Sequence, residues 1–151
     1  MGDVIRMQGV NAVPINVEGK ILLQQRDDRP DLSFPGCWTT FGGAVEDGET
    51  PNEAIRRELL EEIELELPMK LWKVENYPME RDGQRIIVES YTYVGRIDRA
   101  ASEIALNEGQ ALGYFGLEDL DRLKIGFDFE RIFREVFAAL TDGTLPLENN
   151  A

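Results

Sequence analysis

The stretch of sequence that decides the fold runs from residue 43 to residue 65 and reads GAVEDGETPNEAIRRELLEEIEL. Its middle contains Thr-Pro-Asn-Glu at residues 50–53, a capping box with Thr at the N-cap, Pro at the first helical position and Glu at the third. Pro68 limits the far end, because the residue before a proline avoids the helical region. The sequence therefore predicts a helix over about residues 51–64.

This predicted helix has an apolar face and an acidic face. Three apolar side chains share one narrow arc of the helical wheel and are expected to face the core: Ile55, Leu59 and Ile63. The carboxylates of Glu58, Glu61 and Glu62 share the adjacent face, where their mutual repulsion opposes helix formation. Taken alone, such a cluster is most often a solvated surface; the alternative is a site for Mg²⁺ or Mn²⁺, which prefer oxygen ligands.

Composition narrows the available chemistry. The chain has 151 residues, the size of one domain, and its 16 Lys and Arg against 29 Asp and Glu give a net charge of −13. A negative surface disfavours nucleic-acid polymers and anionic membranes. The chain has no histidine, and its single cysteine, Cys37, excludes an internal disulfide and a cysteine-based zinc site. The remaining options are carboxylates, Arg, Lys, Tyr or a hard metal ion.

Targeting signals are not apparent. The opening residues, MGDVIRMQGV, lack the charged-then-apolar layout of a secretory signal. No apolar run approaches the roughly 20 residues that a membrane-spanning helix needs. We therefore expect a cytoplasmic protein.

The rest of the chain is predicted to alternate strands and helices. Strands at 9–16 and 21–25 flank a turn and are expected to form a hairpin, with Pro14 placing the first strand at an edge or a bulge. Further strands are expected at 38–45, interrupted by Gly42-Gly43, and at 70–77, 85–95 and 110–115. Helices are expected at 117–123 and 128–140. We expect a single domain over 1–151, with about residues 142–151 as a frayed tail.

The spacing of the motif resembles the box of the Nudix hydrolases, with MutT-like members as the nearest type. Eight of the nine specified positions match: Gly43, Glu49, Arg57, Glu58, Leu59, Glu61, Glu62 and Leu65. Flanking segments 21–26 and 35–38 also look like the family. The ninth position is a glycine in the family and Glu64 here, so the helix must end with Glu64 in the left-handed region or continue for another turn. The resemblance implies an α/β fold, a Nudix-type α/β/α sandwich with a central mixed sheet.

The resemblance also implies a pyrophosphohydrolase. The expected reaction is Mg²⁺-dependent (or Mn²⁺-dependent) hydrolysis of a phosphoanhydride bond in a nucleoside diphosphate linked to another moiety. The short chain favours nucleoside triphosphates, oxidised ones included, although residues 126–130 lack the asparagine of guanine-specific members. Nucleotide sugars, ADP-ribose and dinucleoside polyphosphates remain alternatives, as does a non-catalytic nucleotide-binding Nudix module. An isomerase of the same fold is disfavoured by the absence of histidine.

Carried over by position, the resemblance assigns roles to the acidic helix and its neighbours. The metal ligands are Glu58, Glu61, Glu62 and the backbone carbonyl of Gly42, with Glu58 or Glu62 doubling as the base. Glu108 resembles the extra loop glutamate of MutT-like members and is a further ligand or base candidate.

Three other box residues are expected to build the frame of the site. Arg57 is expected to pair with Glu49 and orient the ligand cluster, and Gly43 lets metal and phosphate approach the main chain.

Substrate contacts are expected outside the box. Arg26 is predicted to meet phosphate, and Trp38, Phe34 and Tyr77 are equal candidates for stacking on the base. Asp128 is a further candidate for contact with the base. The expected partner is a small-molecule nucleotide. Edge strands and the hairpin at 70–95 also allow a homodimer.

Overall fold

The structure is a computed structural model that describes residues 3–147. Seven strands form one sheet: β1 (Ile5–Ile15), β2 (Ile21–Gln25), β3 (Trp38–Thr39), β4 (Phe41–Ala44), β5 (Lys70–Arg81), β6 (Gln84–Arg96) and β7 (Ala111–Phe115). Two α-helices, α1 (Pro51–Ile63) and α2 (Phe129–Asp142), accompany it. Two short 3₁₀ helices complete the elements: η1 (Ala101–Glu103) and η2 (Leu117–Arg122).

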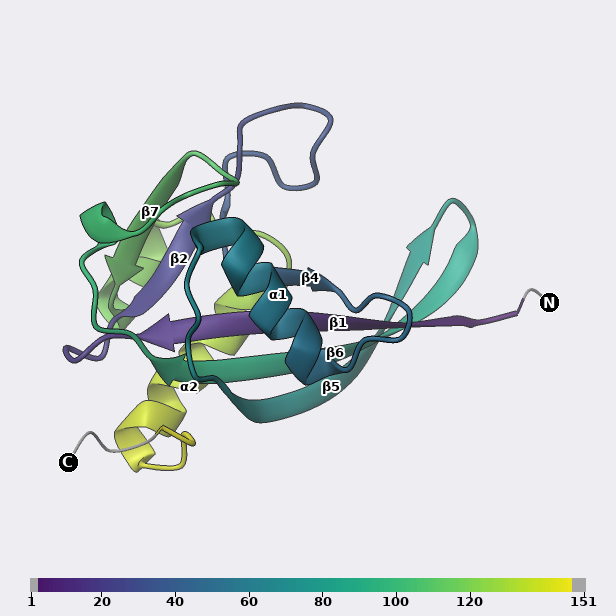
Figure 1. The fold of residues 1–151 in the computed structure, drawn as a ribbon. Coiled ribbons are helices and arrows are strands. Elements are labelled where there is room, and N and C mark those ends of the chain that lie inside the picture. The colour runs from purple at the N-terminus through teal and green to yellow at the C-terminus, as the bar shows by residue number, and fades with distance from the viewer. Residues whose placement is uncertain (1–2, 148–151) are drawn as a thin grey trace.

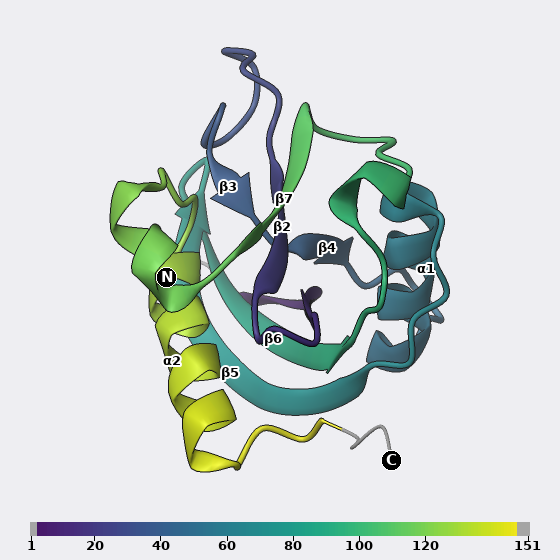
Figure 2. The ribbon, with the colours of Figure 1, turned by 90° about the vertical axis from the view of Figure 1, so that its left-hand side faces the viewer.

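The sheet is mixed and is covered on both faces. Its main strand order is β3-β2-β1-β6-β5, while β4 pairs with β1 and β7 pairs with β2. The β1 and β6 strands run parallel along the whole of β1, and the other pairs are antiparallel. Helix α1 lies on one side of the sheet and α2 on the other (Figures 1 and 2). This arrangement confirms the expected α/β/α sandwich.

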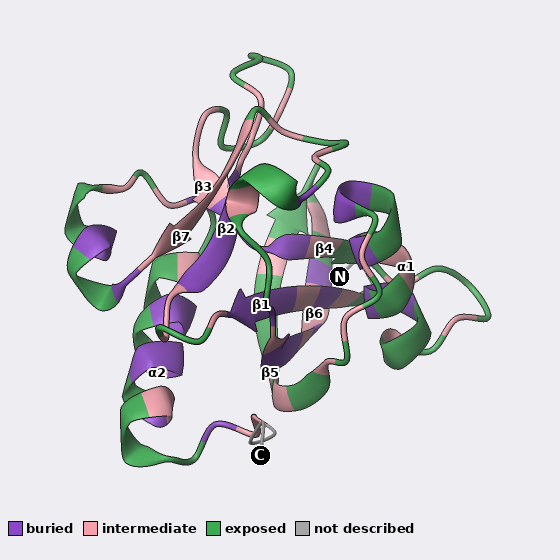
Figure 3. Cartoon of the chain, turned by 60° about the vertical axis from the view of Figure 1, so that its left-hand side comes forward, coloured by how far each residue is buried: buried purple, intermediate pink, exposed green. Residues whose placement is uncertain are grey.

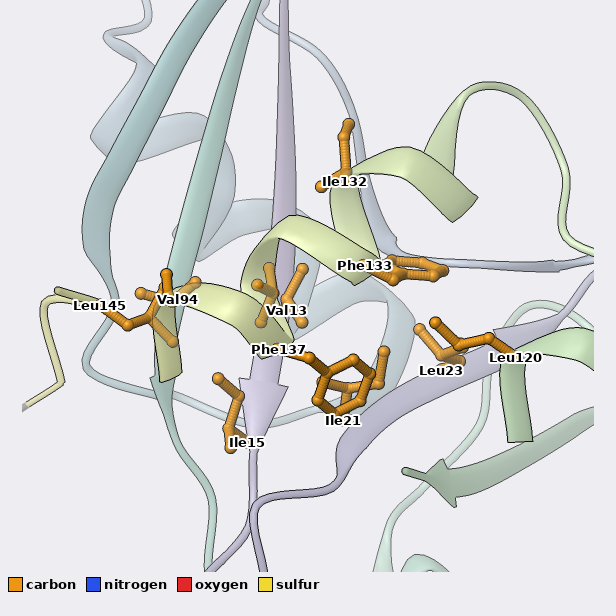
Figure 4. Close-up of a cluster of buried hydrophobic side chains, with 12 residues drawn as sticks. Val13, Ile15, Ile21, Leu23, Val94, Leu120, Ile132, Phe133, Phe137 and Leu145 are labelled. Atoms are coloured by element: carbon orange, nitrogen blue, oxygen red, sulfur yellow. The ribbon is translucent and has the colours of Figure 1, made fainter. Parts of the chain in front are cut away.

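Alternating side chains of the central strands divide the core into two halves. In β1, Val10 and Ala12 face α1, whereas Val13 and Ile15 face α2. Figure 4 shows the α2 side, where Phe133 and Phe137 pack among residues of β1 and β2. Because both faces are covered, consecutive residues are buried where the central strands cross the core, at 12–15 of β1 and 21–24 of β2 (Figure 3).

The prediction for Pro14 was wrong, because β1 is an interior strand of the sheet. Pro14 is paired with Gly95 of β6 on one side. On the other side β4 pairs with residues 9–12 and β2 with Ile15, so Pro14 lies between the two pairings. A missing N–H there removes no ladder bond, and proline is tolerated.

Three boundaries also differ from the expectations. The break in residues 38–45 falls at Thr40, and Gly42-Gly43 continues strand β4. Residues 117–122 form a 3₁₀ helix, η2, in place of an α-helix. The tail expected to fray from residue 142 is folded as far as it is described, since Leu145 is only 8% exposed and packs in the α2-side core; residues 148–151 lie outside the described part.

Candidate active site

Local hydrogen bonds fix both ends of helix α1, and the acidic face of the helix lies beside β4. At its start the Thr50 hydroxyl accepts from the Glu53 N–H at 3.1 Å, and the Glu53 carboxylate accepts from the Thr50 N–H at 3.0 Å. At its end Glu64 adopts the left-handed conformation, with φ 56°, and its N–H donates to the Leu60 carbonyl. The helix therefore ends at Ile63 with Glu64 in the left-handed region, and it does not continue for another turn.

Glu62 is the most buried of the three helix carboxylates, with 3% of its surface exposed. One carboxylate oxygen accepts from the Gly42 N–H at 3.0 Å and the other from Gln24 Nε2 at 3.3 Å. Burial, and secondarily the charge of Glu58, raises the pKa of Glu62 to about 8. A buried carboxyl group held by two donors is therefore aimed at the glycine pair of β4.

The glycine pair leaves room for these carboxylates. A Cβ at Gly43 would lie 2.5 Å from Glu58 Oε1. At Gly42, φ is 152° and a Cβ would clash with the carbonyl oxygen of Val10. Burial raises the pKa of Glu58, with Arg57 opposing the shift. The main chain of β4 therefore lines one wall of the carboxylate cluster without side chains in between.

Arg57 ties the loop before α1 to the acidic face. Its Nε and Nη2 donate to the two carboxylate oxygens of Glu49 at 2.7 and 3.0 Å, which is the expected pairing. Nη2 also donates to the Ala44 carbonyl at 3.1 Å, and Nη1 donates to Glu58 at 3.0 Å and Glu61 at 3.3 Å. The hydrogen bonds that Glu49 accepts from Arg57 lower the pKa of the Glu49 carboxyl group. Such bidentate geometry fixes orientation as well as charge.

Glu108 approaches the cluster from the segment between η1 and β7. Its negative charge contributes to the raised pKa of both Glu58 and Glu62. It lines the same cavity as Glu62, Gly42 and Gly43. The structure thus brings the loop glutamate to the helix carboxylates, although 46 residues separate Glu62 from Glu108 in the sequence.

The donor set fits a hard divalent cation, although the side chains are not arranged around one. Within residues 3–147 no three acidic side chains converge closely enough to hold a metal ion. The reason is visible in the contacts, since Glu58 and Glu61 turn to Arg57 while Glu62 turns to Gly42. All donors are oxygens, and the space beside Gly43 is one that a Cβ would fill. Ion binding would therefore require the side chains of Glu58, Glu61 and Glu62 to rotate toward one another.

A cavity of about 610 Å³ extends from the carboxylates across the sheet. Of the residues predicted for the site, six line it: Arg26, Gly42, Gly43, Glu62, Tyr77 and Glu108. Arg26 donates from Nε to the Ser33 carbonyl at 2.8 Å, and its guanidinium carbon lies 5.4 Å from the centre of the Phe127 ring. The cavity thus combines carboxylates with a cationic and aromatic wall.

Three predicted substrate contacts, Trp38, Phe34 and Asp128, do not line the cavity. The centre of the Trp38 ring lies 4.7 Å from that of Phe115 in an edge-to-face arrangement, and the Trp38 side chain packs against the α2-side core. Trp38 pairs with Gln25 at the sheet, and this position turns the indole to the core. Asp128 is also outside the lining and is held by Arg131 at 2.8 Å, although its neighbours Phe127 and Phe129 both line the cavity.

Sequence reasoning missed part of the aromatic wall. Phe127 is 48% exposed with φ 58°, and its ring lies 4.5 Å from that of Phe34, itself at φ 50°. Left-handed backbone at bulky residues is costly and is concentrated at functional sites. Tyr77 of β5, which the sequence had indicated as a stacking candidate, lines the same cavity, and Arg29 adds a second cation that the sequence analysis did not single out. The signal available in the sequence was the Phe-Asp-Phe run at 127–129.

Comparison with known proteins identifies the family. Residues 5–136 match the NUDIX domain, so the chain belongs to the Nudix family. It is 34% identical to the ADP-ribose pyrophosphatase of Methanocaldococcus jannaschii over 123 residues, which is 80% of this chain and 68% of that protein. It is 42% identical to the CTP pyrophosphohydrolase of Escherichia coli over 62 residues, 41% of this chain and 44% of the relative.

Solved structures share the fold over nearly the whole chain. The Escherichia coli ORF135 protein has a TM-score of 0.65 at 26% identity, covering 95% of this chain and 96% of its own. The NUDIX domain of Shewanella oneidensis NrtR, solved in complex with ADP ribose, has a TM-score of 0.68 at 18% identity, covering 93% and 90%. With the family established, the protein is a Nudix hydrolase. Neither helix within residues 3–147 has the length and apolar composition to cross a membrane.

Proposed function

We propose that this enzyme hydrolyses a phosphoanhydride bond in a nucleoside diphosphate derivative with the help of Mg²⁺ or Mn²⁺. The observation that carries the proposal is that Glu62 of α1 and the bare main chain of Gly42 and Gly43 line one cavity, with Glu58 beside Gly43. A non-catalytic binding module would not need three carboxylates on one face. Their repulsion would be reversed by a bound cation.

The residues that would hold the ion are Glu58, Glu61, Glu62 and the carbonyl of Gly42, with Glu108 as a further ligand or base. A bound ion would neutralise the charge that develops on the phosphoryl oxygens. Either Glu58 or Glu62 takes the proton of the attacking water, since both carboxylates are largely shielded from solvent. Arg57 keeps this set in register through its bonds to Glu49 and Ala44.

The opposite wall of the cavity is proposed to bind the rest of the substrate. The Arg26 guanidinium keeps donors beyond its bond to Ser33 and is suited to phosphate oxygens. Tyr77 and Phe127, each 48% exposed, offer rings on which a base can stack. Asp128 lies next to Phe127 at the rim, where it can still approach a base.

We propose nucleoside triphosphates as the first substrate class, in keeping with the CTP pyrophosphohydrolase relative. ADP-ribose is the second candidate, favoured because the ADP-ribose pyrophosphatase relative aligns over 80% of this chain. Hydrolysis assays with nucleoside triphosphates, oxidised deoxynucleoside triphosphates, ADP-ribose and nucleotide sugars would distinguish them.

The test of the reaction itself is the variant Glu62→Gln. Removing this charged oxygen is expected to lower kcat by at least about 100-fold, in line with loss of a ligand or base, while the circular dichroism spectrum stays unchanged. Glu64→Gln is the matched control, because it changes an exposed glutamate two positions further along and is expected to retain full turnover. Normal turnover by Glu62→Gln would overturn the proposal.

A further inference from the structure

Asn107 joins the segment that carries Glu108 to the end of helix α1. Its backbone N–H donates to the Glu62 carbonyl at 2.9 Å. Its side-chain Nδ2 donates to the Glu61 carbonyl, also at 2.9 Å. One residue thus satisfies two carbonyls of the last helical turn, and these belong to two of the carboxylate-bearing residues.

Those two carbonyls have no partner within the helix. The last four carbonyl groups of an α-helix are left without intrahelical donors. In α1 the Glu64 N–H takes the Leu60 carbonyl, and the left-handed turn at Glu64 directs the chain away from the helix. Asn107 supplies donors for the next two carbonyls from 45 residues beyond Glu62 in the sequence.

The same segment is fixed at its other end by β2. The Gln110 N–H donates to the Gln25 carbonyl at 2.9 Å, and Gln110 Nε2 donates to the Arg26 carbonyl at 3.0 Å. Gly109 has φ 83°, and a Cβ there would lie 2.6 Å from the Gln25 carbonyl oxygen. Glu108 therefore sits between two anchors, and Asn107 is the anchor on the side of the carboxylates.

We propose that Asn107 is a positioning residue that holds Glu108 over the acidic face of α1, so that Glu108 serves the divalent cation together with Glu58 and Glu62. The inference rests on the proposed function, because it gives Glu108 a role in cation binding. Two observations of geometry support it: the two hydrogen bonds from Asn107 to the last turn of the helix, and the place of Glu108 beside Glu62 in the cavity lining.

A competing explanation is that Asn107 only caps the helix. A cap would affect stability, and its effect on catalysis would be independent of Glu108. A positioning residue acts through Glu108, so its effect disappears once the Glu108 carboxylate is gone. The two explanations therefore differ in coupling, which a double-mutant cycle measures.

The experiment compares Asn107→Ala, Glu108→Gln and the double variant in the full chain. The measurements are Mn²⁺ affinity by calorimetry without nucleotide, and kcat and KM with CTP and ADP-ribose. Partners that orient metal ligands are worth about 10- to 100-fold in affinity or activity. We expect Asn107→Ala to weaken Mn²⁺ binding and lower kcat about 10-fold with little change in KM, and the double variant to match Glu108→Gln alone. Asn76→Ala, on the exposed part of β5, is the matched control.

A second variant displaces the same segment without touching α1. Gly109→Ala places a Cβ against the Gln25 carbonyl, so it is expected to weaken Mn²⁺ binding in the same way, again with no further effect in the Glu108→Gln background. Melting temperatures and circular dichroism establish that each variant is folded.

The outcomes separate the two proposals. If Glu62→Gln is inactive but Asn107→Ala binds Mn²⁺ normally, or its effect simply adds to that of Glu108→Gln, positioning by Asn107 is overturned and the proposed hydrolase function stands. If Glu108→Gln itself leaves Mn²⁺ affinity and kcat intact, the inference also fails. If Glu62→Gln retains normal turnover, the proposed function fails first.

Discussion

At the residue scale, Glu62 combines deep burial with a carboxyl group that is held by only two hydrogen bonds. In the metal-free protein this burial raises the pKa of Glu62 from 4.5 to about 8. The folded chain therefore keeps a proton that the unfolded chain releases above about pH 4.5. The associated stability is fully present below that pH and is lost as the pH rises through about 8.

This linkage predicts how the melting temperature of the metal-free protein depends on pH. With a chelator present, the melting temperature is expected to fall between about pH 5 and about pH 8.5, because folding then costs the deprotonation of a buried carboxyl group. Glu62→Gln stays neutral over this range, so its melting temperature should fall less steeply. Differential scanning calorimetry at matched ionic strength measures both slopes, and equal slopes would contradict the pKa assigned to Glu62.

Residue-level prediction from the sequence worked where spacing alone determines geometry. The i, i+3 and i+4 spacing puts Glu58, Glu61 and Glu62 on one face whatever the rest of the chain does. The position of Trp38 outside the cavity lining could not be foreseen, because its environment depends on how β3 pairs with β2, which no local pattern encodes. Phe127 was missed because its exposure results from a left-handed backbone conformation that sequence rules assign to glycine.

At the element scale, strand β4 contributes main chain and no side chains to the carboxylate cluster. Its two glycines have different physical roles. A Cβ at Gly42 would meet backbone of β1, which cannot move without disturbing the sheet. A Cβ at Gly43 would meet the end of the flexible Glu58 side chain, which can rotate away.

The two alanine variants are therefore expected to change different properties, Gly42→Ala the stability and Gly43→Ala the affinity for Mn²⁺. Gly42→Ala should lower stability by about 1–3 kcal/mol, from positive φ and a backbone clash, which is read as a fall in melting temperature. Gly43→Ala should leave the melting temperature nearly unchanged but weaken Mn²⁺ binding about 10-fold, because it displaces a ligand. Calorimetry on both variants tests the contrast. An equal loss of stability in both, with unchanged Mn²⁺ affinity, would show that the glycines serve the sheet alone.

Most helices and strands could be predicted from local sequence signals, but the pairing of the strands with one another could not. The capping box defined the start of α1, and the Asp82-Gly83 turn defined the hairpin of β5 and β6. The interior position of β1 depends on its parallel pairing with β6, whose residues lie about 80 positions further along. Such long-range pairing has no local signature, so Pro14 was read as an edge signal when it lies between two partners.

At the scale of the whole molecule, a net charge of −13 makes the folded chain a repulsive assembly of carboxylates. The densest part of this repulsion lies on α1, between a loop held by Arg57 and a segment held by Asn107. Asn107 binds backbone carbonyls of α1, whereas Arg57 binds Glu49 and the Ala44 carbonyl together with the proposed cation ligands Glu58 and Glu61. The site is therefore built by long-range contacts, and a cation would stabilise those contacts together.

Mg²⁺ is accordingly expected to raise the melting temperature. An ion that binds only the folded state stabilises it by RT ln(1 + [L]/Kd), about 2.7 kcal/mol at 100 times Kd. For a domain of about 150 residues this corresponds to an increase of roughly 5–10 °C. General screening of an acidic chain would also be stabilising, so NaCl at equal ionic strength is the reference, and Glu62→Gln is the control protein. An increase specific to Mg²⁺ and lost in Glu62→Gln locates the ion at the carboxylates of α1, whereas an equal increase in both proteins would assign it to surface charge.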